Sequence, residues 1–270
     1  MLVIAKLCLV AFVFGLLERT PRLRAAPQPF FRRGFGTDLL HLAVTSAVTS
    51  GMVAWIALAS DALAALGVPR LASLGGPSLA FALPAFALLD LGQTLVHRAL
   101  HRFEPLWELH KVHHSSPALD WLATFRAHGA EHLVRSGLAP LGLIALGPPI
   151  EAVALAAGVH GVVSIANHAN LSGAWLGWLE PVFVTPRLHR VHHVARCSER
   201  NFAVALTLWD RLLGSFAPAR DATAEGPLPV LGVPGEEQSY PQRWSEHLVL
   251  PLRRIAARQP RLAAQRNTMT

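Results

Sequence analysis

Clustered histidines are the residues of this chain best suited to chemistry. One cluster has the spacing HxxxH, and two have the spacing HxxHH. The clusters comprise His97 and His101; His110, His113 and His114; and His189, His192 and His193. Residues three and four apart project from one face of a helix, so each cluster can direct two or three imidazoles toward one point. This spacing predicts a metal site.

Adjacent histidines indicate that the site holds a pair of metals. Neighbouring side chains on a helix, such as those of His113 and His114, point about 100° apart. One member of the pair can therefore serve one metal while the other serves a second. The pattern favours a di-metal centre.

The composition predicts an integral membrane protein of the all-α class. Hydrophobic residues make up 52% of the chain, only 15% are charged, and the mean hydropathy is +0.36. These values lie outside the range of soluble globular domains. The apolar runs are Leu2–Leu17, Leu39–Leu66, Leu79–Val96 and Leu138–Ala166. The first run is expected to be a retained helix, because arginines follow it, whereas a signal peptide carries its charges before the apolar run.

Charge and parity together predict the topology. Arg32 and Arg33 precede the second apolar run, and Arg98 and Arg102 follow the third, which places both loops on the cytoplasmic side. Histidines on both sides of the fourth run must reach one site, and a single crossing would separate them by a bilayer about 30 Å thick. We therefore expect a re-entrant or tight hairpin of two short helices near 138–166, broken at Pro148 and Pro149.

Several other classes of function are disfavoured. A net charge of +7 and a pI near 10.8 would suggest nucleic acid in a soluble protein, but here the arginines flank apolar runs. The two cysteines form no CxxC, and no dinucleotide or phosphate-binding loop is found, so reducing equivalents must come from another protein. The C-terminal stretch Pro241–Arg266 is expected to be a basic interfacial helix without a chemical role.

Six motifs together resemble the fatty acid hydroxylase / sterol desaturase superfamily of membrane di-iron enzymes. They are HRALH from His97, LWELHKVHHSS from Leu106, LDWLATFRAHGAE from Leu119, NHAN from Asn167, TPRLHRVHH from Thr185 and NFAVALTLWDRLLGSF from Asn201. The resemblance implies an integral membrane helical bundle with a cytoplasmic histidine-rich site, in which a non-haem di-iron centre uses O2 to oxidise a lipid. The upstream helix with its basic loop also resembles the bacterial members, which implies the bacterial inner membrane. The implied units are N-terminal membrane helices (1–89), a catalytic domain (90–216) and a cytoplasmic or interfacial tail (217–270).

The same resemblance extends the ligand set beyond the three clusters. It implies ligand roles for all eight clustered histidines, for His128 of RAHGAE and for His168 of NHAN. Gly129 stands where the family has proline, and Glu131 is the acid that recurs in this motif. Imidazole suits iron, copper, nickel and zinc, and iron is expected because zinc cannot change its oxidation state; zinc remains possible in a purified sample.

The remaining polar residues receive other expectations. His41 and His247 lie outside the matched region and are expected to be surface or interface histidines. His160 is expected either to point at the cytoplasmic cavity or to be a hydrogen-bonded core histidine, and His132 is either a neighbour of a ligand or an interface residue. Asp90 lies seven residues before His97 and is expected to accept a ligand N–H.

A metal-handling protein, either a transporter or a zinc-dependent hydrolase, is the alternative to an oxidase. A transporter would spread its ligands along a crossing path, and a hydrolase needs only about three protein ligands. Within the oxidase interpretation, hydroxylation and desaturation stay open. So do acyl-chain, sterol or hopanoid, ether-lipid and carotenoid substrates.

Overall fold

The computed structural model describes residues 2–172, 174–220 and 230–267, and this part of the chain is helical without a β-strand. The predicted all-α class is confirmed. The α-helices are α1 (Leu2–Leu17), α2 (Phe35–Ala65), α3 (Ser78–Arg102), α4 (Glu104–His114), α5 (Gly129–Leu138), α6 (Leu141–Leu146), α7 (Ile150–His168), α8 (Pro186–His193), α9 (Thr207–Leu212) and α10 (Trp244–Asn267). Short 3-10 helices cover Leu71–Leu74, Trp121–Phe125, Ala174–Leu179 and Ala195–Cys197.

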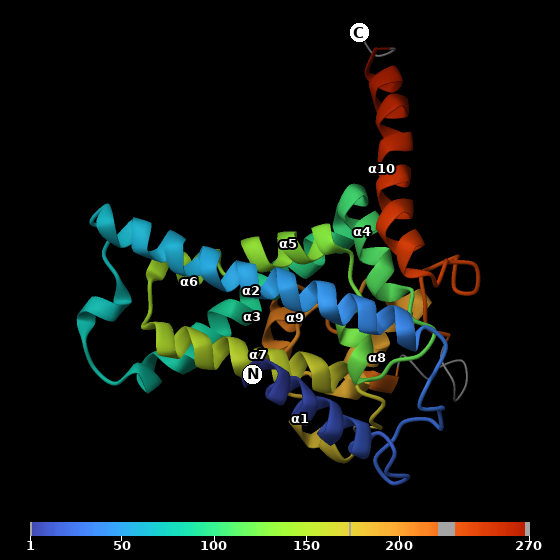
Figure 1. Ribbon diagram of the computed structural model, residues 1–270, viewed down its shortest axis with the longest axis horizontal. Coiled ribbons are helices and arrows are strands. Elements are labelled where there is room, and N and C mark those ends of the chain that lie inside the picture. Colours follow the sequence, from blue (N-terminus) through green and yellow to red (C-terminus); the bar gives the residue numbers. More distant parts are fainter. Residues whose placement is uncertain (1, 173, 221–229, 268–270) are drawn as a thin grey trace.

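Three helices, α2, α3 and α7, are long and apolar enough to cross a membrane. They lie side by side with the α5–α6 segment in an elongated bundle (Figure 1). Ser78 approaches Glu151 at 3.4 Å and Asp90 approaches His160 at 3.1 Å, so α3 and α7 run in the same direction. Both therefore end, with their histidines, at the same end of the bundle.

The chain reverses between α6 and α7 at the predicted break. Gly147 ends α6 in the left-handed conformation with φ 59°, and Pro148 and Pro149 follow before α7 begins. The expectation of two short helices fits α6, which has six residues, but not α7, which has 19. No proline interrupts the apolar sequence after Pro149, so α7 continues as one helix to His168.

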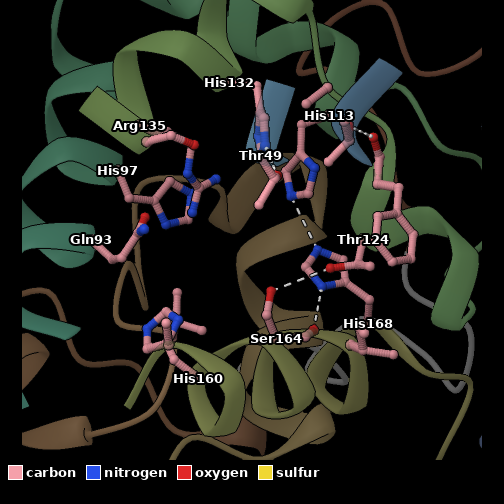
Figure 2. A pocket seen from close by; sticks show the side chains of 18 of the residues that line it. Thr49, Gln93, His97, His113, Thr124, His132, Arg135, His160, Ser164 and His168 are labelled. Atoms are coloured by element: carbon pink, nitrogen blue, oxygen red, sulfur yellow. Dashed lines mark hydrogen bonds between the residues drawn. The ribbon is translucent and has the colours of Figure 1, made fainter. Parts of the chain in front are cut away.

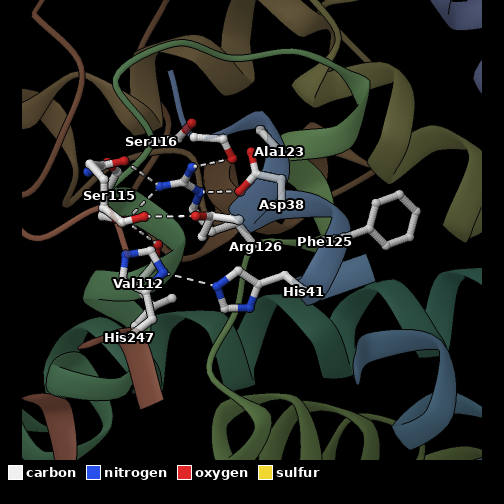
Figure 3. A network of polar contacts seen from close by, with 12 residues as sticks. Asp38, His41, Val112, Ser115, Ser116, Ala123, Phe125, Arg126 and His247 are labelled. Carbon is white, nitrogen blue, oxygen red and sulfur yellow. Dashed lines mark hydrogen bonds and ion pairs between the residues drawn. The ribbon is translucent and has the colours of Figure 1, made fainter. Parts of the chain in front are cut away.

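A buried group of charges connects the start of α2 to the loop before α5 and to the segment before α10 (Figure 3). Asp38 accepts hydrogen bonds from Arg126 Nε at 2.5 Å and from Arg32 Nη2 at 2.7 Å. Arg32 also binds Asp120 at 2.5 Å, and Arg126 Nη1 donates to Gln242 Oε1 at 2.8 Å. Buried charges are tolerated when they are paired in this way, so the network fixes the C-terminal segment against α2.

The expectation that His41 and His247 lie at a surface or interface is wrong. Both are buried, with exposed fractions of 1% and 0%, and His41 Nε2 lies 3.0 Å from His247 Nδ1 (Figure 3). His247 Nε2 donates to the Pro241 carbonyl at 2.8 Å, so its Nδ1 is the acceptor for His41. The reason is tertiary: α10 begins against α2, although 206 residues separate the two histidines, and only its later part projects from the bundle (Figure 1).

Gly92 on α3 generates a prediction about packing. A Cβ added there would lie 2.1 Å from the Ala139 carbonyl oxygen, which is backbone and cannot move aside alone. We expect Gly92→Ala to lower the free energy of unfolding by about 1–3 kcal/mol, as overpacking does. The measurement is thermal unfolding of the purified protein in detergent.

Gly158→Ala on α7 is the matched control, because a Cβ there meets nothing within 4 Å. This variant should be neutral or more stable than wild type, since alanine favours helix over glycine. Equal unfolding temperatures of the two variants would contradict the close approach of α3 to Ala139.

Candidate metal centre

Four helices bring nine histidines together at one end of the bundle. The histidines form two buried groups, and within each group the candidate ligand atoms lie within 4.8 Å of one another. The first group is His97, His101, His110, His114 and His192, and the second is His113, His168, His189 and His193. Helices α3 and α4 supply the HxxxH and the first HxxHH, α7 supplies His168 from its last turn, and α8 supplies the second HxxHH.

Adjacent histidines are divided between the two groups. His113 and His193 belong to the second group, whereas their neighbours His114 and His192 belong to the first. The angle of about 100° between neighbouring helical side chains produces this division. Two short helices, α4 and α8, therefore serve both groups at once.

The hydrogen bonds of the second group show that it can hold a cation. His113 Nδ1 donates to the Arg126 carbonyl and His168 Nδ1 donates to the Ser164 carbonyl, each at 2.9 Å. A carbonyl oxygen has no proton to give, so each Nδ1 carries the hydrogen and each Nε2 of a neutral ring carries a lone pair. Yet the two Nε2 atoms face each other at 3.1 Å (Figure 2). Facing lone pairs repel, and a metal ion between them removes the repulsion.

Histidines of the first group also donate from Nδ1 to backbone carbonyls, which leaves their Nε2 atoms without a hydrogen. His97 Nδ1 donates to the Phe202 carbonyl at 2.7 Å, and His192 Nδ1 donates to the Arg200 carbonyl at 2.8 Å. Among the described residues, the buried His192 Nε2 has no hydrogen-bond partner. Burial, followed by the charge of His101, lowers the pKa of His192, so this ring is neutral and its free nitrogen is available to a metal.

The spacing between the ring nitrogens fits metal coordination. Nε2–Nε2 distances in the two groups lie between 3.1 and 3.3 Å. With bonds of 2.1 Å, neighbouring ligands are about 3.0 Å apart around an octahedral ion and about 3.4 Å apart around a tetrahedral one. The two groups therefore fit metal ions bound by imidazole, the ligand that suits iron, copper, nickel and zinc.

Glu131 is the carboxylate that orients a histidine of the first group. It is fully buried, and its Oε1 lies 2.8 Å from His110 Nδ1. A carboxylate that accepts a hydrogen bond from Nδ1–H fixes the tautomer of its histidine and leaves Nε2 free for a metal.

Asp90 does not have the expected contact with a ligand histidine. It accepts hydrogen bonds from the backbone N–H groups of Ala205 and Leu206 at 2.9 and 2.8 Å, and its third partner is His160. Asp90 shares the helix face of His97, but seven residues separate them by about 10 Å along the axis. His160 is buried and hydrogen-bonded, and it also lines the cavity described below, so both expectations for it hold.

Polar residues after α8 hold the loop that orients His97. Asp210 accepts hydrogen bonds from the backbone of Phe202 and Ala203 at 2.8 and 3.0 Å. Asn201 adopts φ 55°, and its side chain donates to the carbonyls of Leu188 and Ala217. These contacts place the Phe202 carbonyl where His97 Nδ1 can donate to it.

His128 is the one expected ligand that the structure does not bring to either group. It precedes α5, where its Nδ1 accepts a hydrogen bond from the Ala130 N–H at 3.1 Å. Its Nε2 donates to the Leu248 carbonyl at 3.2 Å. Both ring nitrogens are therefore used in capping a helix and holding α10, and neither is free for a metal.

A cavity of about 370 Å³ adjoins both groups, between α2, α3, α5 and α7. Ligand candidates from both groups line it, namely His97, His113, His168 and His189. Figure 2 shows that Gln93 and His97 come from α3, His132 and Arg135 from α5, and His160, Ser164 and His168 from α7. Apolar side chains such as Ile56 and Leu89 complete the lining. Sequence analysis gave no signal for Gln93 or Arg135, because neither belongs to a histidine motif.

Comparison with known proteins places this site in a family. Residues 82–215, which include all nine histidines, match the fatty acid hydroxylase family. The segment that carries the two histidine groups is thus a match to the fatty acid hydroxylase family. The recognition made from the histidine motifs is therefore confirmed.

Two kinds of curated relative are similar to this chain. The chain is 33% identical over 131 residues to an ornithine lipid hydroxylase of Rhizobium tropici. The aligned segment covers 48% of this chain and 39% of the relative. The chain is also 34% identical over 146 residues to the alkylglycerol monooxygenase of Danio rerio and 30% identical to that of Homo sapiens, each covering 53% of this chain and 32% of the relative. The chain thus spans well under half the length of these relatives. No solved structure matches it.

The position of His128 generates a prediction about metal binding. We expect His128→Asn to retain the metal content of the wild type, because asparagine is itself a good helix cap. His168→Asn should lower the metal content, because it removes an imidazole that faces three others in the second group. Elemental analysis of the purified proteins makes the measurement. Loss of metal in His128→Asn alone would show that the ligand set implied by the resemblance is the correct one.

Proposed function

We propose that this chain is a membrane-bound lipid oxidase that uses O2 and two iron ions to hydroxylate or desaturate a lipid C–H bond. The observation that carries the proposal is the pair of imidazole groups beside one cavity in a bundle of membrane-length helices. The names of the relatives, a lipid hydroxylase and alkylglycerol monooxygenases, support a lipid as substrate.

Iron suits this reaction better than the other metals that imidazole binds. Attack on an unactivated C–H bond needs a metal that changes its oxidation state, which zinc does not do. A zinc hydrolase would use about three protein ligands, whereas nine histidines converge here. A transporter would distribute its ligands along a path near the bilayer midplane, and these histidines gather at one end of the helices.

The residues of this chain prepare the site in three ways. Backbone carbonyls and Glu131 accept hydrogen bonds from the Nδ1–H groups and so orient the rings. The cavity holds the lipid beside histidines of both groups. Burial excludes water from the groups, each of whose members is buried. The iron ions, when bound, supply the activation of O2.

The stoichiometry of the reaction requires a reductant. In hydroxylation, one atom of O2 enters the C–H bond and the other leaves as water, and two electrons and two protons are consumed. In desaturation the same O2 leaves as two molecules of water after two hydrogens are removed. We propose a separate electron-donor protein, which acts at the cytoplasmic face of a bacterial inner membrane. Positive charges next to the histidine segments, such as Arg98, Arg102 and Arg190, support that orientation.

The first test of this proposal counts the metal. Protein produced with abundant iron should contain about two iron atoms per chain, because each group has enough imidazoles for one ion. Elemental analysis with a protein assay gives the ratio. A ratio that stays at one under every loading condition would exclude the di-iron centre.

The second test identifies the product. Membranes that contain the protein should yield a lipid that has gained one oxygen or lost two hydrogens, and ¹⁸O₂ should label a hydroxylated product. Mass spectrometry of lipid extracts makes the measurement. The His192→Asn variant, inserted at the same level, serves as the control and should give no product, because it removes a free ring nitrogen from the first group. Unchanged lipid profiles with the iron-loaded protein and a supplied reductant would refute the oxidase proposal.

A further inference from the structure

Arg135 places a positive charge in the cavity, and within the residues that the structure describes only one distant carboxylate balances it. Its side chain is only 18% exposed, and it lines the cavity from α5 (Figure 2). Among the described residues, its polar contact is an ion pair with Glu131, in which Nη1 lies 3.6 Å from Oε1. That distance is too long for a hydrogen bond, and the same Oε1 is already 2.8 Å from His110 Nδ1. The guanidinium donors are therefore left facing the cavity.

Gln93 provides a second unused polar group in the same space. It lies on α3, one helical turn before His97, and lines the cavity. In the described part of the chain its buried Oε1 has no hydrogen-bond partner. The side chains of Gln93 and Arg135 point toward a common space beside His97 (Figure 2). An amide oxygen accepts hydrogen bonds, so the unpartnered Oε1 can be satisfied by a donor such as a ligand hydroxyl, and the amide Nε2–H groups are the donors that Gln93 can offer to an anionic ligand.

The charge of the cavity selects the ligand. Glu131 is the one acidic residue among those described as lining it, and it is engaged by His110. The nine ligand candidates are imidazoles, which do not neutralise a metal ion. Metal ions would therefore add positive charge beside Arg135. A negatively charged group in the ligand is favoured over a neutral one in such a desolvated space.

We propose that Arg135 and Gln93 bind an oxyanion, a carboxylate or a phosphate, in the polar group of the lipid substrate. This inference rests on the proposed function, because it names the class of lipid that the oxidase takes. The planar guanidinium matches either oxyanion with two parallel hydrogen bonds. A Gln93 Nε2–H group donates a further hydrogen bond to the oxyanion, and the apolar lining receives the start of the hydrocarbon chain.

The position of this subsite also limits which carbon reacts. Arg135, Gln93 and ligand histidines of both groups line one cavity of about 370 Å³. A lipid whose oxyanion lies on Arg135 therefore has its first few carbons nearest the metal centre. Oxidation falls close to the polar group and not in the far half of the hydrocarbon chain.

The test measures binding of three radiolabelled lipids to the purified, metal-loaded chain in detergent. N-Hexadecanoylglycine carries a carboxylate, hexadecanoyl lysophosphatidic acid carries a phosphate, and 1-O-hexadecylglycerol is neutral. We expect wild type to prefer at least one oxyanion lipid over the neutral one, and the preferred lipid identifies the source of the oxyanion. Arg135→Met should weaken binding of that lipid at least tenfold and leave the affinity for hexadecylglycerol unchanged.

Two further variants keep this test decisive. Gln93→Leu should weaken binding of the same lipid several-fold. Gln93 has no hydrogen bond to Glu131 or His110 in the described part of the chain, so this variant tests the subsite even if Arg135→Met loses metal. Arg98→Met removes an exposed arginine of α3, whose Nη1 donates to the Leu213 carbonyl, and should change no affinity. Equal affinity of wild type for all three lipids, or equal weakening of all three by Arg135→Met, would overturn the oxyanion subsite.

The product gives a separate measurement. Fragmentation mass spectrometry should place the new oxygen or double bond within the first few carbons from the polar group. A product modified in the far half of the chain would contradict the subsite while leaving the oxidase intact. Conversely, selective binding of oxyanion lipids without any oxidation would retain the subsite and refute the oxidase.

Discussion

The candidate metal centre depends on one electrostatic constraint, which is the repulsion between lone pairs on imidazole nitrogens that face each other. His113 and His168 are held in this arrangement because the Nδ1–H of each donates a hydrogen bond to a backbone carbonyl. Their Nε2 atoms lie 3.1 Å apart. Cations relieve the repulsion, so metal binding and packing of the helix ends are coupled. The loops that supply the carbonyl acceptors therefore belong to the site as much as the helices that carry the histidines.

Arg126 connects this site to the buried charges at the base of α2. Its carbonyl accepts from His113, while its guanidinium binds Asp38 and Gln242. Removing one partner from such a network leaves a buried charge unpaired, which costs about 3–5 kcal/mol. A membrane helix, the loop before α5 and the segment before α10 are thus positioned by the same contacts that orient a ligand candidate.

The cavity combines requirements that oppose each other in a membrane. The helices must be apolar to cross the bilayer, yet the end of the bundle holds nine imidazoles and a loosely compensated arginine. Charges and polar groups in such a position are costly unless they face the interior of the bundle. Collecting them around one cavity resolves the conflict, because the lipid-facing surfaces stay apolar while the polar groups face the interior of the bundle.

The sequence by itself determined the membrane helices, the histidine spacing and the break at Pro148 and Pro149, because hydropathy, helical periodicity and proline geometry act over a few residues. It did not determine which side chains meet across the bundle. Glu131 and not Asp90 contacts a candidate ligand histidine, His128 caps α5, and His41 pairs with His247. Such contacts depend on the relative position of whole helices, where a displacement along the axis of about 10 Å for seven residues decides whether a carboxylate reaches a ring. Only packing of segments far apart in the chain sets that displacement.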